Sequence, residues 1–203
     1  SEEEKAVRIE MFDNDIERIL YIDPLRGSKI EEIERIDIYP ATHYANTKEN
    51  IDRAIEDIEE ELNLTLKDFK NNNKLVEAQR LEERTKYDLE MLREVGFCSG
   101  IENYSRHLSN RKEGEQPPTL LEYFPSDWLL IVDESHVTLP QVRAMYKGDR
   151  SRKGSLVNYG FRLPSALDNR PLQFPEFMAL LNQVVFVSAT PSEFEKEYSN
   201  QEI

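Results

Sequence analysis

Apolar and polar positions alternate along the first forty residues as they do in short antiparallel strands. Residues 6–12 (AVRIEMF) place three apolar side chains on one face, and Arg8 and Glu10 on the other. The turn-forming residues DND separate this stretch from a second alternating stretch at 16–22, and RIDIYP at 35–40 is a third short one. The pattern predicts a small antiparallel sheet with its apolar face covered and its charged face in solvent.

From Thr47 onward the apolar positions follow the period of a helix. Thr47 is a suitable N-cap, and an apolar stripe continues from it to the polar interruption NNN at 71–73. A second stripe runs from Leu75 to Gly96, a glycine suited to follow the last turn of a helix. We therefore predict two long antiparallel helices. Acidic runs such as EDIEEE (56–61) form their solvated face, and a coiled-coil surface for a partner is the alternative.

The pattern changes again after the loop-like segment 109–119. DWLLIVDE (127–134) and QVVFVSATP (183–191) are continuous apolar runs that predict buried strands, and PEFMALL (175–181) predicts a helix between them. Continuous apolar strands separated by helical material indicate a parallel sheet that is covered on both faces. The fold class that we predict is therefore α/β, with a small antiparallel β domain and a helical hairpin before the parallel sheet.

Composition adds limits on compartment and partners. The chain has 26 basic and 40 acidic residues, and its net charge of −14 argues against a protein that coats nucleic acid nonspecifically. The single cysteine, Cys98, excludes an internal disulfide and fits a reducing compartment. No apolar run approaches the roughly 20 residues that a membrane span needs, and no signal peptide opens the chain. We expect a cytoplasmic protein, or a piece of one, that has no membrane partner.

Candidate chemistry lies at Asp133 and Glu134, where the first buried strand ends. Unpaired carboxylates are costly to bury, and ligands of open parallel sheets bind beyond the carboxyl ends of the strands. In nucleoside triphosphatases an aspartate in this position holds magnesium through water, and the glutamate acts as general base toward the attacking water. Without further support, the two carboxylates fit an ordinary strand-to-loop turn better.

The second buried strand also ends in small polar residues, Ser188, Ala189 and Thr190. Because parallel strands end at the same edge of a sheet, we expect these hydroxyls close to Asp133 and able to bond to the carboxylates and to His136. SAT by itself is a weak signal. DE-x-H and SAT in this order are the second and third motifs of superfamily 2 helicases.

The segments between these motifs resemble the UvrB family of bacterial excinuclease subunits. DESHVTLPQVRAMYKGDRSRK and YGFRLPSALDNRPL carry the resemblance most strongly. Residues 77–108 resemble the family's helical insertion, and RIEMFDNDIERI followed by IYPATHY is similar to the end of its UvrA-binding domain. The resemblance covers essentially the whole chain. It implies the end of the UvrA-binding β domain at 1–45, a helical subdomain at 46–120, and part of a superfamily 2 helicase-like motor domain at 121–203.

The resemblance implies a role in nucleotide excision repair. A complete member of the family is delivered to damaged DNA by UvrA, verifies the damage with ATP and magnesium, and recruits UvrC. The family's phosphate-binding loop, G-x-x-x-x-G-K-[ST], occurs nowhere in the 203 residues. We therefore expect an internal fragment that lacks the UvrC-binding helices, binds no cofactor tightly and hydrolyses no ATP alone. The alternatives are a non-catalytic interaction module and the UvrB-like part of a transcription-repair coupling factor, against which the intact DESH and SAT motifs count.

Site residues are carried over from the family by position. The catalytic positions, with Asp133 also the magnesium residue, are Asp133, Glu134 and His136. The motif that couples nucleotide state to DNA movement matches Ser188, Ala189 and Thr190. Charged positions at the UvrA interface match Arg8 and Glu10, which without the resemblance are simply two solvated surface charges.

A basic segment reverses the sign of the charge locally. Its residues are Arg143, Lys147, Arg150, Arg152 and Lys153. Contacts with DNA phosphates and a solvated helix are equally good interpretations of these charges. Tyr146 and Tyr159 flank the segment and either stack on bases or pack against the core, with packing favoured. The resemblance places the following proline-constrained loop near the DNA path, and so Arg162 and Arg170 are predicted DNA contacts.

Overall fold

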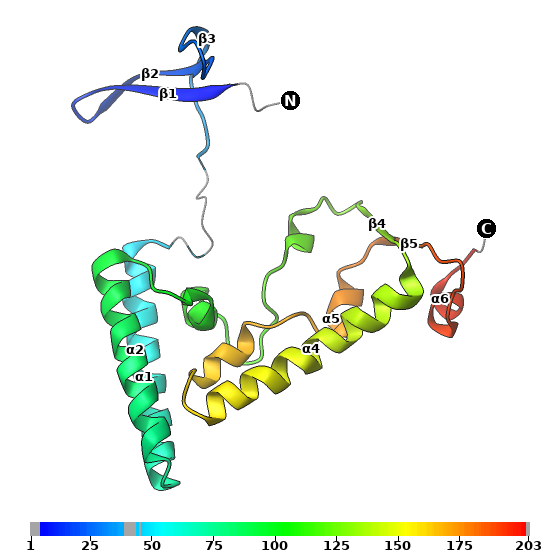
Figure 1. The fold of residues 1–203 in the computed structure, drawn as a ribbon. Coiled ribbons are helices and arrows are strands. Elements are labelled where there is room, and N and C mark those ends of the chain that lie inside the picture. The colour runs from blue at the N-terminus through cyan, green and yellow to red at the C-terminus, as the bar shows by residue number, and fades with distance from the viewer. Residues whose placement is uncertain (1–4, 39–43, 45, 202–203) are drawn as a thin grey trace. The chain divides into compact units, whose positions relative to one another are not determined.

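The computed structural model describes residues 5–38, 44 and 46–201, which form two compact units (Figure 1). The first unit comprises residues 1–45 and the second residues 46–203, and each is described by itself. None of the helices in the described part of the chain is both long and apolar enough to cross a membrane.

The first unit is a three-stranded antiparallel sheet with the order β1-β2-β3. Its strands are β1 (Ala6–Phe12), β2 (Asp15–Ile22) and β3 (Lys29–Ile33). The first two strands were predicted from the alternating pattern. The third prediction was wrong, because residues 35–38 form no strand and the third strand comes earlier. The remaining part of that prediction, 39–40, lies outside the described residues.

A side-chain-stabilised turn explains the early position of β3. The Asp23 carboxylate accepts hydrogen bonds from the backbone N–H groups of Leu25 and Arg26, at 2.8 and 3.0 Å. Gly27, with φ of 66°, donates its backbone N–H to the Asp23 carbonyl at 2.7 Å. The chain has therefore reversed by Ser28, and β3 begins at the next residue.

Burial on the two faces of this sheet differs from the expectation. Leu20 is buried, and it lies opposite Arg8 in the strand register, on the face expected to be solvated. Val7 and Ile9 are each 38% exposed, and Met11 is 57% exposed. The turn after β2 approaches Arg8, since a Cβ atom at Gly27 would lie 3.5 Å from its guanidinium, and the apolar face of β1 is open among the described residues.

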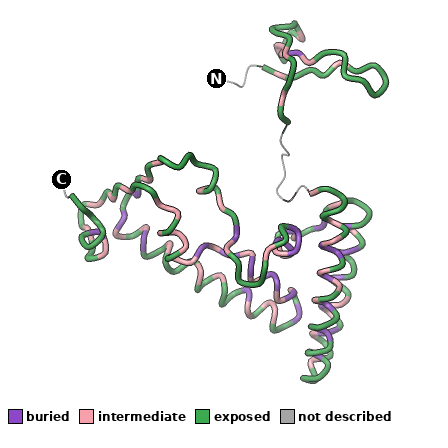
Figure 2. The backbone as a smooth tube through the Cα atoms, turned by 180° about the vertical axis from the view of Figure 1, so that it is seen from behind, coloured by how far each residue is buried: buried purple, intermediate pink, exposed green. Residues whose placement is uncertain are grey.

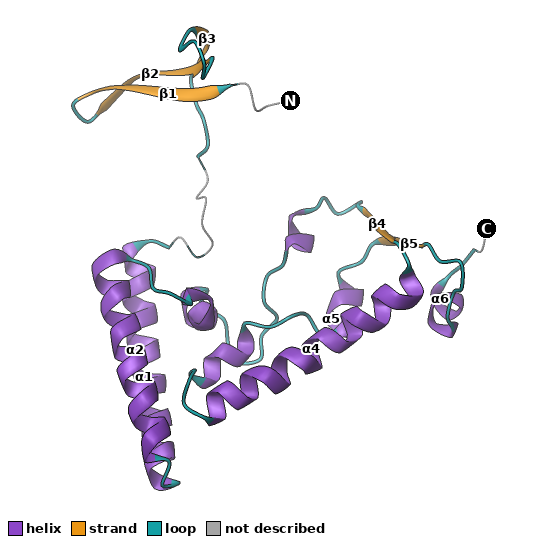
Figure 3. Ribbon diagram, viewed as in Figure 1, coloured by secondary structure: helices purple, strands orange, loops and turns teal. Residues whose placement is uncertain are grey.

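The second unit begins with the predicted helical hairpin, formed by α1 (Lys48–Asn71) and α2 (Leu75–Val95) (Figure 3). The Thr47 hydroxyl caps α1 by accepting a backbone N–H of the first turn at 3.4 Å. The left-handed Gly96, with φ of 73°, ends α2. Both predicted caps are confirmed.

The apolar stripes of the two helices face each other and are buried along the hairpin (Figure 2). The buried apolar residues are Ala54, Ile55, Ile58, Leu62, Leu66 and Phe69 of α1 and Ala78, Leu81, Leu89 and Leu92 of α2. Each fully buried leucine or isoleucine contributes about 1.5–3 kcal/mol relative to an exposed side chain. The stripes predicted from the helical period therefore form the core of the hairpin.

The rest of this unit holds the parallel strands and the segments around them. Its elements are η2 (Ile101–Tyr104), α3 (Ser105–Leu108), η3 (Leu120–Tyr123), β4 (Leu129–Val132), α4 (Ser135–Asn158), η4 (Pro164–Asp168), α5 (Phe174–Ala179), β5 (Gln183–Phe186) and α6 (Glu193–Tyr198). β4 and β5 pair in parallel, as predicted. The charged segment after β4 is one long helix, α4.

The prediction that both faces of the parallel sheet are covered was wrong for the described residues. Leu129 and Ile131 of β4 are 49% and 62% exposed, and Val185 of β5 and Val187 just beyond its end are each 45% exposed. Because side chains alternate between the faces of a sheet, these four residues share one face. Only the opposite face, which carries the buried Val132, packs against the rest of the unit.

The C-terminal end of α4 packs closely on the first turns of α2. Gly160 has φ of 71°, and a Cβ atom at this position would lie 2.3 Å from the carbonyl oxygen of Glu77. Arg80 donates to the carbonyl of Tyr159 at 2.6 Å, and its guanidinium lies 4.3 Å from the centre of the Phe161 ring. The helical hairpin is thereby joined to the helix that begins at the parallel strands.

Candidate functional site

The candidate site lies where β4 and β5 end. Val132 pairs with Phe186 at the end of the ladder, and the backbone continues the connection beyond the strands. The N–H of Val187 donates to the Val132 carbonyl at 2.9 Å, and the N–H of Ser135 donates to the Val187 carbonyl at 3.0 Å. The segments that carry the DESH and SAT residues are therefore held side by side, as the parallel arrangement predicted.

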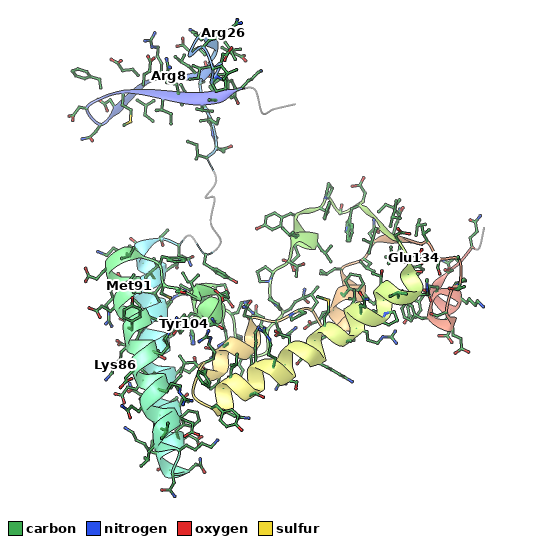
Figure 4. All side chains as sticks on the ribbon, in the orientation of Figure 1. Arg8, Arg26, Lys86, Met91, Tyr104 and Glu134 are labelled. Atoms are coloured by element: carbon green, nitrogen blue, oxygen red, sulfur yellow. The ribbon has the colours of Figure 1, made fainter. Side chains whose placement is uncertain are left out.

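The carboxylates of Asp133 and Glu134 occupy an exposed turn between β4 and α4 (Figure 4). Asp133 Oδ1 accepts the backbone N–H of Glu134 at 3.0 Å, and the Asp133 carbonyl accepts the Thr138 hydroxyl at 2.9 Å. Glu134 has φ of 45°, a left-handed conformation that is uncommon outside glycine and concentrated at functional sites. Both carboxylates reach solvent, and so neither is buried without a partner.

His136 connects the two strand ends. Its Nδ1 lies 2.8 Å from Ser188 Oγ and 3.5 Å from Glu134 Oε2. Ser188 Oγ also accepts the backbone N–H of Thr190 at 3.1 Å. The structure thus brings together four predicted site residues: Glu134, His136, Ser188 and Thr190. The exposed Ala189 lies between the two hydroxyl residues.

A buried hydrogen bond behind this turn was missed from the sequence. The side chain of Ser135 is fully buried, and its hydroxyl donates to Glu195 Oε1 at 2.9 Å. Glu195, which is 3% exposed, also accepts the backbone N–H of Ser192 at 3.0 Å and the Ser192 hydroxyl. Burial alone would raise the pKa of the Glu195 carboxyl, but these hydrogen bonds hold the pKa below its usual value. The capping-box spacing S-x-x-E directly after SAT was the available signal.

The carboxylates at this turn suit a magnesium ion that keeps most of its water ligands. Among the described residues, no group of three or more His, Cys, Asp or Glu side chains is placed to hold a metal ion. Magnesium commonly keeps several waters and uses one or two carboxylates together with substrate phosphates. The exposed Asp133 fits that mode, and the residues present do not form an all-protein metal cage.

Arg8 and Glu10 lie two residues apart on β1 and therefore share one face of the sheet. Glu10 forms an ion pair with Arg18 of β2 at 2.6 Å, with side chains that are 30% and 52% exposed. Arg8 is exposed and lies against Gly27, where an added Cβ would meet its guanidinium at 3.5 Å. Exposed ion pairs contribute little to stability, so these charges remain available to a partner.

Three of the residues predicted to contact DNA interact with other side chains of the protein. The guanidinium of Arg143 lies 4.5 Å from the ring centre of Phe174 and 5.1 Å from that of Phe194. Lys153, 8% exposed, pairs with Asp149 at 2.9 Å and donates to a backbone carbonyl of the following loop. Lys153 is buried by its contacts, whereas Arg143 remains exposed beside the two rings.

Arg170 is the third of these residues. It is 8% exposed, and its guanidinium makes two hydrogen bonds to the Glu176 carboxylate at 2.7 and 2.8 Å. It also lies 5.3 Å from the ring centre of the half-buried Tyr146, which agrees with a packing role for that tyrosine. Tyr159 is 60% exposed.

The other predicted DNA contacts reach solvent to different degrees. Lys147 and Arg150 are exposed and lie three residues apart, on one face of α4. Arg152 is exposed and pairs with Asp149 at 3.0 Å. Arg162 is half-buried and donates to its neighbouring carbonyl at 2.8 Å. The basic segment therefore divides into structural and accessible residues.

A second buried polar cluster joins α1, α3 and η4. Glu61 Oε2 lies 2.7 Å from His107 Nε2, while Glu61 Oε1 accepts the backbone N–H of Ser165 at 2.7 Å. Arg106 pairs with Asp168 at 2.9 Å and with Glu61 at 3.5 Å. Burial opposes ionisation of Glu61, but the bonds from His107 and Ser165 hold the pKa of its carboxyl below the usual value. The sequence reasoning did not identify this cluster, whose members come from segments far apart in the chain.

Comparisons with known proteins identify the chain. Residues 1–44 match the model of the UvrB interaction domain, and residues 49–110 match the model of the UvrB third helical domain, together more than half of the chain. This combination defines a class of multidomain proteins with an interaction domain followed by a helical domain. The chain belongs to the UvrB family.

Relatives named UvrABC system protein B match along almost the whole chain. The protein of Carboxydothermus hydrogenoformans is 60% identical over 198 residues, which cover 98% of this chain and 30% of that relative. The protein of Psychromonas ingrahamii is 58% identical over 201 residues, 99% of this chain and 30% of that relative. The chain thus spans about 30% of the length of these curated relatives, whose names favour the UvrB family over a transcription-repair coupling factor.

Proposed function

We propose that the chain is part of a UvrB-type subunit that acts in nucleotide excision repair, and that residues 121–203 belong to a superfamily 2 helicase-like motor domain. The observation that supports this best is the hydrogen-bonded pair of His136 and Ser188, at 2.8 Å, across two parallel strand ends. The residues proposed to form the second and third helicase motifs are thereby in contact, which supports coupling between them.

The open face of the parallel sheet supports a larger motor domain. Purely parallel sheets are normally covered on both faces, yet Leu129, Ile131, Val185 and Val187 are substantially exposed. An exposed apolar face of this kind is unfavourable in water. Together with the greater length of the relatives, this exposure supports further strands and helices from the rest of the protein.

Within that motor domain the exposed turn would act in ATP hydrolysis. Asp133 would hold magnesium through water, and magnesium would neutralise charge on the transferred phosphate. Glu134 would accept a proton from the attacking water as general base. His136, fixed by Ser188, would transmit changes at this turn to the SAT segment. ATP and magnesium are therefore the ligands proposed for the full-length protein.

Substitution of Glu134 in the full-length protein tests this function. Glu134→Ala should reduce ATP turnover by about 10²–10⁴-fold, the range expected for loss of a general base, and leave nucleotide binding intact. Turnover is followed by phosphate release, and binding by fluorescent-nucleotide titration. Glu197→Ala, on exposed α6 surface, is the control. Retained turnover in Glu134→Ala would contradict the assignment. The 203-residue chain alone should show none, because its sequence contains no phosphate-binding loop.

The proposed partners are damaged DNA, UvrA and UvrC. The accessible candidates for phosphate contacts are Arg143, Lys147, Arg150, Arg152 and the half-buried Arg162. Arg8 and Glu10 are the candidates for binding UvrA, and UvrC would be recruited through parts of the protein outside this sequence. We place this activity in the cytoplasm.

A non-catalytic interaction module is the second candidate function. The match of residues 1–44 to an interaction domain and the open apolar face of β1 favour it for the first unit. The two proposals are compatible, because the interacting surface and the motor residues lie in different units.

A further inference from the structure

Glu195 of α6 accepts a buried hydrogen bond from Ser135, in the DESH turn formed by residues 133–136. Sequence reasoning did not single it out. We propose that Glu195 is a positioning residue for the DESH turn: it holds the buried Ser135 hydroxyl, and so determines where the neighbouring Asp133 and Glu134 carboxylates lie. Its consequence for ATP hydrolysis rests on the proposed function. Its consequence for the geometry of the turn does not.

Ser135 is held at two atoms. Its backbone N–H donates to the Val187 carbonyl at 3.0 Å, and its hydroxyl donates to Glu195 at 2.9 Å. The residue is fully buried and is the first residue of α4. Glu134 immediately before it has the left-handed φ of 45°. A rotation of this turn would break both bonds of Ser135 and leave buried polar groups unpaired, which is costly.

Glu195 is itself held in place by α6. Its second carboxylate oxygen accepts the backbone N–H and the hydroxyl of Ser192 at the start of this helix. The neighbouring Phe194 packs with its ring centre 6.3 Å from that of Phe186 and 5.5 Å from that of Phe174. The acceptor of the Ser135 hydroxyl therefore belongs to an element fixed by aromatic packing.

Besides the backbone bond from Ser135 to Val187, two side-chain connections join the segment after β5 to the segment after β4. The His136–Ser188 bond is partly exposed, whereas the Ser135–Glu195 bond is buried. A hydrogen bond to a charged group in a buried environment is stronger than one in water. The buried bond thus defines the resting position of the turn, and loss of its acceptor should loosen the turn without detaching α6, which Phe194 still holds.

The first test measures the turn directly in the 203-residue chain. Glu195→Gln and Ser135→Ala should each increase amide hydrogen exchange of residues 134–138 by about tenfold, while exchange along α1 and α2 stays unchanged. Glu197→Gln makes the same chemical change at an exposed site of α6 and should leave exchange at the turn unaltered. Unchanged exchange at the turn in both Glu195→Gln and Ser135→Ala would overturn the proposal.

The second test measures turnover in the full-length protein. Glu195→Gln and Ser135→Ala should each lower kcat about tenfold with KM for ATP nearly unchanged, because the first removes the charge that strengthens the bond and the second removes its donor. The double variant should be no slower than Ser135→Ala, because both changes act on the same bond. Fully additive losses, or a change confined to KM, would overturn the proposal. If Glu195→Gln impairs folding, the smaller change Ser135→Ala decides by the same criteria.

The two tests separate the positioning role from the proposed function. If the unaltered full-length protein hydrolyses no ATP, or if Glu134→Ala keeps full turnover, the proposed function fails. Faster exchange at the turn in Glu195→Gln would still support the positioning role. Conversely, normal turnover and normal exchange in Glu195→Gln, together with an inactive Glu134→Ala, would reject the positioning role alone.

Discussion

Buried carboxylates connect the helical hairpin to the segments that pack against it. Asp88 is 3% exposed and accepts hydrogen bonds from Tyr104 at 2.8 Å and from Arg84 at 3.0 Å. Glu61 similarly accepts bonds from residues of α3 and η4. Because an unpaired buried carboxylate is strongly destabilising, removal of one donor should be measurable at each site.

Tyr104→Phe should destabilise the chain by about 1–3 kcal/mol, because it removes one of the two donors to the buried Asp88 carboxylate. The pKa of Tyr104 is raised mainly by burial and by Asp88, so its hydroxyl is a neutral donor at neutral pH. Urea unfolding of the chain measures the change. Tyr87→Phe removes the hydroxyl of a tyrosine that is 58% exposed and should have little effect. Equal stabilities of Tyr104→Phe and the parent chain would contradict the assigned role.

Glu61 should make stability depend on pH. Its folded pKa is lowered from 4.5, because bonds from His107 and Ser165 outweigh burial. The unfolded chain therefore binds the proton more readily, and the stabilisation is complete above about pH 4.5 and is lost as the pH falls through the folded pKa. Compared with the parent chain, Glu61→Gln should lose less stability between pH 7 and pH 3 in urea titrations. An equal loss would show that Glu61 is not responsible.

At the scale of elements, α4 combines a loosely covered surface with one tight contact at its end. Gly148 and Gly154 lie within the helix, and a Cβ atom at either would meet nothing within 4 Å. Gly160, just after the helix, approaches the backbone of Glu77 closely. Of these three glycines, Gly160 is the one that the packing requires, at the point where the chain after α4 meets α2.

Gly160→Ala and Gly148→Ala should change stability in opposite directions. The Cβ of Gly160→Ala would lie 2.3 Å from a backbone oxygen at a positive φ, so the contact between α4 and α2 must separate and stability should fall by more than 1 kcal/mol, about the cost of such strain. Gly148→Ala should stabilise the helix by about 0.5–1 kcal/mol. Thermal unfolding of both variants provides the comparison, and a stabilised Gly160→Ala would contradict the packing described.

At the scale of the whole molecule, the two units present different kinds of surface. The sheet of the first unit exposes Arg8 and the apolar side chains of β1, which suits contact with another protein. The second unit carries the exposed carboxylate turn and the accessible basic residues of α4. This division agrees with one unit for interaction and another for nucleotide and DNA.

Arg8→Glu should weaken binding of UvrA sharply, because it reverses the charge of an exposed side chain at the proposed interface. Arg26→Glu makes the same charge change on an exposed side chain of the same unit and serves as the control (Figure 4). Titration of UvrA with each variant by calorimetry measures the affinity. Equal affinities for Arg8→Glu and the parent chain would remove this surface from the interface.

The sequence by itself determined six of the helices and strands and the positions of the chemical groups at the strand ends. The alternating period identified β1 and β2, the helical period and caps identified α1 and α2, and apolar runs identified β4 and β5. These features depend on local conformational preference and on burial of one face, both of which are written in neighbouring residues. The strand-end location of Asp133 and Ser188 follows from the same local pattern.

Only the tertiary structure decided which faces are covered and which charges are paired. Alternation in β1 separates two faces, but only the structure shows that Leu20 of β2 is buried on the charged one. Likewise, Lys153 and Arg170 read as free positive charges in the sequence, yet each is buried against a carboxylate. The Ser135–Glu195 bond joins residues sixty positions apart. Such contacts depend on how distant segments pack, and local periodicity contains no information about that.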